Sequence, residues 1–181
     1  MSGGVRNVSI HNLIIRNTPR ALYIKSARGR GGYVQDVKYS NIQIIRSNQA
    51  IRVAEDYREV HPNQTAVPMV RNISFDHIEA LQVDKAVTVI GLPDAVIQNF
   101  NGNHILFTIS AEGRAAGDPY ECHYAKGSWT YVTPRPSCEE LLDMAQLSKD
   151  SKLPAAKGPR MIHASAFWGC GTGAARVDRC L

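Results

Sequence analysis

A nine-residue frame occurs four times in the first two thirds of the chain, and this repeat constrains the fold more than any other feature. The copies read VRNVSIHNL, VQDVKYSNI, VRNISFDHI and IQNFNGNHI, and they begin at Val5, Val34, Val70 and Ile97. Apolar residues recur at the first, fourth and ninth positions, and at the sixth in every copy except the last, where Gly102 stands. This alternation of apolar and polar residues, rich in β-branched and aromatic side chains, predicts strands.

A second apolar segment follows each of the first three copies at a constant distance. Sixteen residues after each start lie ALYI, AIRV and AVTV, which begin at Ala21, Ala50 and Ala86. The four units start 29, 36 and 27 residues apart, and the variation falls in loop-like segments such as HPNQTAVP. Units of strand, turn, strand and variable loop, with almost no helical periodicity, predict stacked coils that bury their apolar positions against one another. We therefore expect an all-β chain folded as a β-solenoid.

Asparagine recurs at the third and eighth positions of the frame. The residues concerned are Asn7, Asn72 and Asn99 at the third position, and Asn12 and Asn41 at the eighth. Because asparagine tolerates left-handed backbone geometry, we expect turns between the faces of the coil at these positions. His77 and His104 occupy the eighth position of the other two copies, which favours the same structural role over a catalytic one.

Positive charge is concentrated at the start of the chain. The first 35 residues contain six basic residues and no carboxylate, although the net charge of the whole chain is only +5. Such a segment attracts anionic partners, but a solvated face explains most runs of this kind. The stretch SARGRGG contains Arg28 and Arg30 and leads into a strand, so it lacks the Lys-Ser/Thr pair and the helix of a phosphate loop. A nucleic-acid-binding module is the weaker alternative, because only Tyr23 and Tyr33 flank the basic residues.

Cysteines, histidines and sequons indicate the compartment rather than a cofactor. The four cysteines lie in the C-terminal third without CxxC spacing, and the remaining histidines lack metal-ligand spacing, so we expect no metal and no cofactor. Asn-x-Ser/Thr sequons at Asn7, Asn63 and Asn72 favour a secreted glycoprotein. No apolar run is long enough to span a membrane, so no membrane partner is expected.

Four segments of the chain, SGGVRNVSIHN, ALYIKSARGRGGYVQDVKYSNI, AIRVAEDY and VPMVRNISFDHIEA, together resemble the C-terminal half of glycoside hydrolase family 28, the polygalacturonases and related pectinases. The resemblance extends from Met1 to about Leu141. It implies a right-handed parallel β-helix that hydrolyses α-1,4-linked galacturonan in pectin with inversion. The implied partner is this acidic polysaccharide, with no nucleic acid, and the full-length protein is expected to be a monomer.

The segment YECHYAKGSWTYVTPRPSCEEL is similar to the C-terminal part of the plant members of the family. This similarity implies a disulfide between Cys122 and Cys138. A disulfide agrees with the secreted, cell-wall location that the sequons favour.

The family's substrate-contacting motif is Arg-Ile-Lys, followed at a distance by a tyrosine. Here the motif reads Tyr-Ile-Lys and ends at Lys25, and the later tyrosine corresponds to Tyr57. The resemblance implies that Lys25 and Tyr57 contact substrate and that Lys25 holds a galacturonate carboxylate. Tyr23 stands in place of the arginine, and a phenol offers one donor and no charge instead of a two-pronged cation. Arg28 and Arg30 are the candidates to replace it.

The family's catalytic motifs, Asn-Thr-Asp, Asp-Asp and Gly-His-Gly, do not occur in this chain. Inverting hydrolysis needs two carboxylates placed across a water, whereas Glu55 and Asp56 are adjacent, and a strand would point them to opposite faces. We therefore expect no catalytic residue and a fragment, truncated at the N-terminal end of the β-helix, that is inactive alone and prone to associate at its exposed first coil. A non-catalytic carbohydrate-binding solenoid is the alternative. Residues 142–181 fit neither the repeat nor the family, so an irregular, poorly ordered tail is expected after the domain at 1–141.

Overall fold

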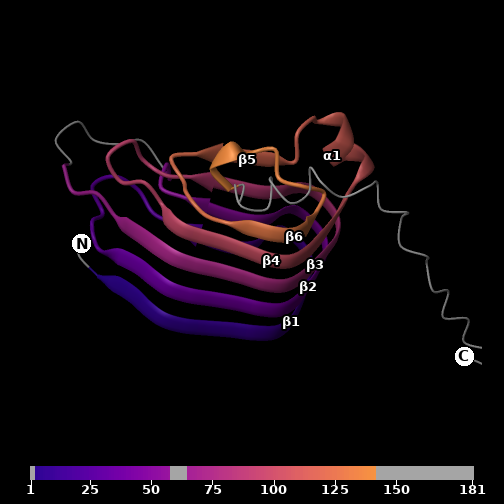
Figure 1. Cartoon of the computed structure of the whole chain (residues 1–181), viewed down its shortest axis with the longest axis horizontal. Coiled ribbons are helices and arrows are strands. Elements are labelled where there is room, and N and C mark those ends of the chain that lie inside the picture. The colour runs from indigo at the N-terminus through magenta and orange to yellow at the C-terminus, as the bar shows by residue number, and fades with distance from the viewer. Residues whose placement is uncertain (1–2, 58–64, 142–181) are drawn as a thin grey trace, which may run out of the picture.

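The structure is a computed structural model that describes residues 3–57 and 65–141. The expectations for Asn63 and for the tail at 142–181 lie outside these residues. The chain forms β1 (Gly4–Lys25), β2 (Tyr33–Ala54), β3 (Met69–Ile90) and the shorter β4 (Gln98–Ile109), which pair in parallel in this order. β5 (Tyr120–His123) pairs with β3, and β6 (Trp129–Thr133) pairs with β4 (Figure 1). The stacked parallel strands confirm the β-solenoid that the repeat predicts and the parallel β-helix that the resemblance implies.

Each long strand bends around the coil at three corner residues with positive φ. The corners lie five residues apart, at Asn7, Asn12 and Asn17 in β1, Asp36, Asn41 and Arg46 in β2, and Asn72, His77 and Gln82 in β3. Their φ values of 52° to 58° lie in the left-handed region. The first two corners are the third and eighth frame positions, so the predicted turns, including the structural role of His77, are confirmed. The third corner was not predicted.

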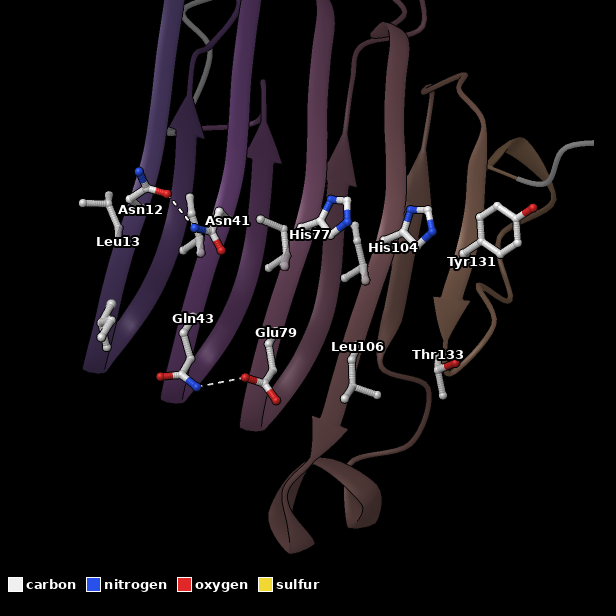
Figure 2. A pocket seen from close by; sticks show the side chains of 14 residues that line it. Asn12, Leu13, Asn41, Gln43, His77, Glu79, His104, Leu106, Tyr131 and Thr133 are labelled. Atoms are coloured by element: carbon white, nitrogen blue, oxygen red, sulfur yellow. Dashed lines mark hydrogen bonds between the residues drawn. The ribbon is translucent and has the colours of Figure 1, made fainter. Parts of the chain in front are cut away.

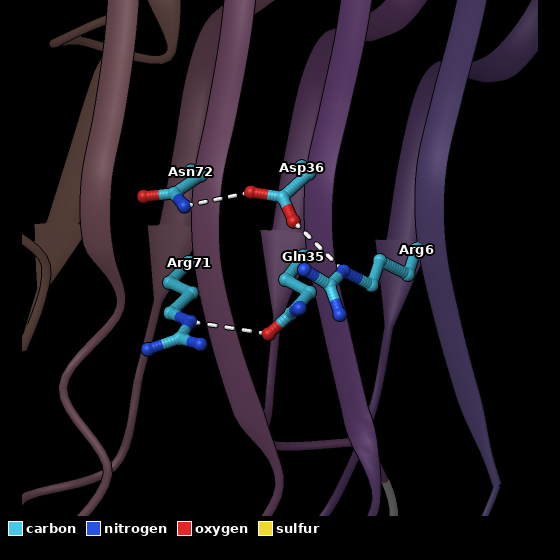
Figure 3. Close-up of polar contacts among 5 residues, drawn as sticks. All are labelled: Arg6, Gln35, Asp36, Arg71 and Asn72. Atoms are coloured by element: carbon cyan, nitrogen blue, oxygen red, sulfur yellow. Dashed lines mark hydrogen bonds and ion pairs between the residues drawn. The ribbon is translucent and has the colours of Figure 1, made fainter.

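Side chains at the first corner form a hydrogen-bonded ladder between coils. Asn72 Nδ2 donates to Asp36 Oδ1 at 2.7 Å, and Asn99 Nδ2 donates to Asn72 Oδ1 at 2.8 Å. Arg6 Nε donates to the second oxygen of Asp36 at 3.3 Å (Figure 3). The Asn72 amide, together with Arg6, holds the pKa of the Asp36 carboxyl below its ordinary value. The ladder therefore fixes the register of the coils and engages both polar atoms of the Asn72 side chain.

Aromatic rings stacked from coil to coil form part of the core. The Tyr39 and Phe75 rings are parallel with centroids 5.2 Å apart, and Phe100 meets Phe75 edge-on at 5.3 Å. Trp129, from the last strand, packs against Phe100 at 5.5 Å and donates its Nε1–H to the Phe100 carbonyl at 2.9 Å. A Cβ at position 102 would lie 2.5 Å from the Trp129 ring. The glycine that interrupts the repeat thus makes room for the indole.

The two ends of the coil differ. β1 pairs only with β2 among the described residues, and Ile14 on this edge strand is 63% exposed. Association at this edge stays a prediction. At the other end, α1 (Ala111–Ala115), which the sequence analysis did not predict, is capped by Ser110 Oγ. The 3-10 turn η1 (Glu139–Leu141) comes after β6. A disulfide joins Cys122 and Cys138, the pair that the resemblance implies.

Candidate functional site

The segments that follow the third corner build one flat face of the coil. Within it, Tyr23 pairs with Arg52 and Lys25 pairs with Ala54 in the parallel register of β1 and β2. β3 and β5 continue the same rows with Thr88 and Glu121, and with Ile90 and His123. We call the outward side of segments 23–25, 52–54, 88–90 and 121–123 the strand-end face. Lys25 and Tyr23 share it because residues two apart on a strand point to the same side.

Lys25, Tyr57 and Arg30 form a cluster at the edge of the strand-end face. Lys25 Nζ lies 4.4 Å from the centroid of the Tyr57 ring, and Arg30 Cζ lies 5.8 Å from the same centroid. Both distances are within the range of cation–π attraction. The Tyr57 amide donates to the Ser26 carbonyl at 3.1 Å, which ties the loop after β2 to the loop after β1. Lys25 and Arg30 also line a pocket of about 230 Å³.

The other two predicted binding residues have different neighbours. Tyr23 is half-buried, and Arg20 Cζ lies 5.3 Å from the centroid of its ring. Arg28 donates both amino groups to the Asp94 carboxylate, one of them at 2.9 Å. This bidentate hydrogen bonding lowers the pKa of Asp94. The structure therefore brings Lys25, Tyr57 and Arg30 together. The two terminal amino groups of Arg28, in contrast, already donate to Asp94.

Arg52 is a cation on the strand-end face that the sequence reasoning missed. Its Nη2 lies 3.5 Å from Asp56 Oδ1, and its side chain is 18% exposed. Its Nε is buried without a hydrogen-bond partner among the described residues. The signal was present in the repeat, because Arg52 stands one unit of 29 residues after Tyr23 and is its register partner.

Glu55 is a buried carboxyl just after β2. It is 1% exposed, and neither carboxyl oxygen has a hydrogen-bond partner of normal geometry within the described part of the chain. Burial raises its pKa to about 7; the nearby Asp94 charge raises it further, and the Leu92 backbone opposes the rise. The Asp56 side chain is 46% exposed. The two carboxyls therefore have different surroundings.

A larger groove of about 760 Å³ lies beside the second corner, on a different face of the coil. The rings of His77, His104 and Tyr131 stack along it with centroids 4.9 and 4.8 Å apart (Figure 2). Ligand atoms of Asp76, His77 and His104 lie within 4.8 Å of one another, a grouping that the sequence analysis did not predict. The ring stack and a 3.0 Å hydrogen bond from Asn103 to Asp76 account for this arrangement as a second ladder between coils.

Comparison with known proteins identifies relatives of the chain. A sequence model of glycosyl hydrolases family 28 matches residues 2–111, which is more than half of the chain. A probable polygalacturonase of Vitis vinifera is 25% identical over 146 residues, which cover 79% of this chain and 29% of the relative. A probable polygalacturonase of Arabidopsis thaliana is 28% identical over 94 residues, which cover 50% and 21%. No solved structure matches. The chain spans less than a third of the length of these relatives.

Proposed function

Because this chain belongs to glycosyl hydrolases family 28, we propose that it is part of a polygalacturonase-type hydrolase and that its strand-end face binds galacturonan. The observation that carries the proposal is the exposed Lys25 ammonium, 4.4 Å from the centroid of the Tyr57 ring, with Arg30 beside the same ring. Galacturonan carries a carboxylate on each sugar. A face that presents cations close to an aromatic ring offers both charge and apolar surface to such a chain.

The Tyr57 ring also contributes to the orientation of Lys25. An exposed lysine loses rotamer freedom when it binds, and this loss subtracts from affinity. Attraction to the ring restricts the side chain of Lys25 before the ligand arrives, while its ammonium keeps donors for a carboxylate. Arg30 supplies a second positive charge at the same pocket.

The proposal assigns no catalytic residue to the described part of the chain. Glu55 is buried, and the Asp94 carboxylate accepts hydrogen bonds from Arg28. Inverting hydrolysis of galacturonan, which we propose for the whole hydrolase, needs an acid and a base placed across a water. We therefore expect this chain alone to bind galacturonan without cleaving it. A secreted location agrees with the disulfide, since such bonds persist in oxidising compartments. None of the described helices is long and apolar enough to cross a membrane.

Binding of trigalacturonate, followed by isothermal titration calorimetry, tests the proposal. We expect Lys25→Ala to weaken binding about tenfold, in line with the loss of one charge-assisted hydrogen bond. Arg16→Ala is the matched control, because it removes one exposed cation from β1 before the Asn17 corner. Equal affinities of the wild type and Lys25→Ala, or no binding by the wild type, would exclude the assigned site.

Two further measurements separate the alternatives. Release of reducing sugar from polygalacturonate is expected to equal that of a protein-free blank, and release above the blank would show that the chain has its own catalytic groups. Binding to duplex DNA with a steep salt dependence, without binding to trigalacturonate, would favour the nucleic-acid module instead.

A further inference from the structure

Arg52 faces the same side of the coil as Lys25. It pairs in register with Tyr23, which lies two residues before Lys25 on the neighbouring strand. Register partners in a parallel sheet point to the same side, and adjacent strands are about 4.8 Å apart. Arg52 and Lys25 are therefore diagonal neighbours on one surface.

The course of the Arg52 side chain brings its charged end towards Lys25. Its Nη2 reaches Asp56 Oδ1, four residues further along the chain, so the side chain runs along the strand past Ala54. Ala54 faces outward beside Lys25, yet it is only 1% exposed, which agrees with a side chain lying over it. This course directs the guanidinium towards the row that Lys25 and Ala54 share.

The described residues hold the guanidinium of Arg52 only loosely. Its 3.5 Å separation from Asp56 exceeds the 2.7–2.9 Å that is typical of charge-assisted hydrogen bonds. Its Nε and the Thr88 hydroxyl, neighbours in register, are both buried without partners among the described residues. Arg28, in contrast, uses its fork on Asp94.

We propose that Arg52 and Lys25 form a two-cation subsite on the strand-end face that binds one carboxylate of a uronate unit between β1 and β2. Arg52 supplies two parallel N–H donors, and Lys25 supplies a point charge from the next strand. This inference rests on the proposed function and adds to it a residue outside the Tyr-Ile-Lys motif. It predicts that the face prefers a free acid to its methyl ester, because the ester has no charge for the pair to neutralise.

Calorimetry with trigalacturonate and with its methyl ester tests the subsite. We expect Arg52→Ala to weaken binding of the free acid about tenfold and to leave binding of the ester unchanged. Arg52→Lys should recover part of the affinity, because it keeps the charge but loses the fork. Arg16→Ala is the control for net charge. Urea unfolding of each variant checks that the coil is intact.

A rescue variant separates a lost contact from a disturbed fold. Tyr23→Arg places a guanidinium next to position 52 on the same row, so the double variant Tyr23→Arg/Arg52→Ala should regain most of the affinity for the free acid. If Lys25→Ala weakens binding while Arg52→Ala binds as the wild type does, the subsite is wrong and the proposed function stands. If neither variant changes the affinity, or the wild type does not bind, the proposed function fails and the subsite fails with it.

Discussion

Replacing Glu55 by glutamine should change how the stability of the coil depends on pH. Glutamine has the size of the acid but does not ionise. The pKa of Glu55 rises from 4.5 to about 7 in the folded chain, chiefly because of burial. The folded state therefore holds this proton more tightly than the unfolded state does. For the wild type, the neutral acid leaves stability intact below pH 4.5; stability then falls as the pH rises towards 7, and the loss is complete above about pH 7.

The expected size follows from the shift. Each pKa unit corresponds to about 1.36 kcal/mol, so a rise from 4.5 to about 7 amounts to about 3 kcal/mol. Relative to Glu55→Gln, the wild type should thus lose about 3 kcal/mol of unfolding free energy between pH 4.5 and pH 8.5. Glutamine carries its own buried amide, but that cost is independent of pH and cancels in the difference between the two pH values.

Urea unfolding at several pH values measures this difference. Other titrating groups are common to both proteins, so the wild type minus Glu55→Gln difference isolates the one carboxyl. Asp56→Asn is the matched control, because it removes a neighbouring carboxylate that is 46% exposed and should show no comparable loss. A wild type minus Glu55→Gln difference that stays constant from pH 4.5 to 8.5 would refute the reasoning and would mean that water or a cation reaches the Glu55 carboxylate.

Three further changes test the fold. Reduction of the Cys122–Cys138 disulfide, which links residues 16 apart, should lower the free energy of unfolding by about 3 kcal/mol in urea titrations; unchanged midpoints after reduction would count against a stabilising role. Asn41→Ala should be less stable than Asn41→Gly by about 1 kcal/mol in the same assay, because position 41 has a φ of 52° that alanine adopts at a cost; the reverse order would contradict this account of the corner. Gly102→Ala should cost about 1–3 kcal/mol, since the new Cβ meets the Trp129 ring at 2.5 Å, and should alter tryptophan fluorescence; wild-type stability and emission would show that the ring has room.

The sequence predicted most of the coil because the spacing between repeat units gives the register between neighbouring strands. The unit spacings of 29, 36 and 27 residues recur as the offsets between paired strands. Asparagine at the third and eighth frame positions marked two of the three corners. The third corner was missed because it carries Asn17, Arg46 and Gln82, and only the first of these is a residue with a strong preference for left-handed geometry.

The candidate site was less predictable, because its contacts join loops of variable length. Arg28 reaches Asp94 across 66 residues, and no local pattern indicates that this pair forms. Arg52 was within reach of the sequence analysis, since the repeat aligns it with Tyr23. Whether its guanidinium is available to a ligand, however, depends on how the side chain runs towards Asp56. The stack of His77, His104 and Tyr131 likewise required β6 to pair with β4.

By itself, then, the sequence determined a coil of stacked strands and the positions of most of its turns, whereas the substrate contact expected of Lys25 stays a prediction. It did so because a repeat forces identical backbone geometry on every unit, and stacking then places equivalent residues side by side. Only the tertiary structure decided which cations keep free donors, which carboxyl is buried and which rings stack. These properties depend on side chains meeting across coils, where burial and pairing are set by neighbours far away in the sequence.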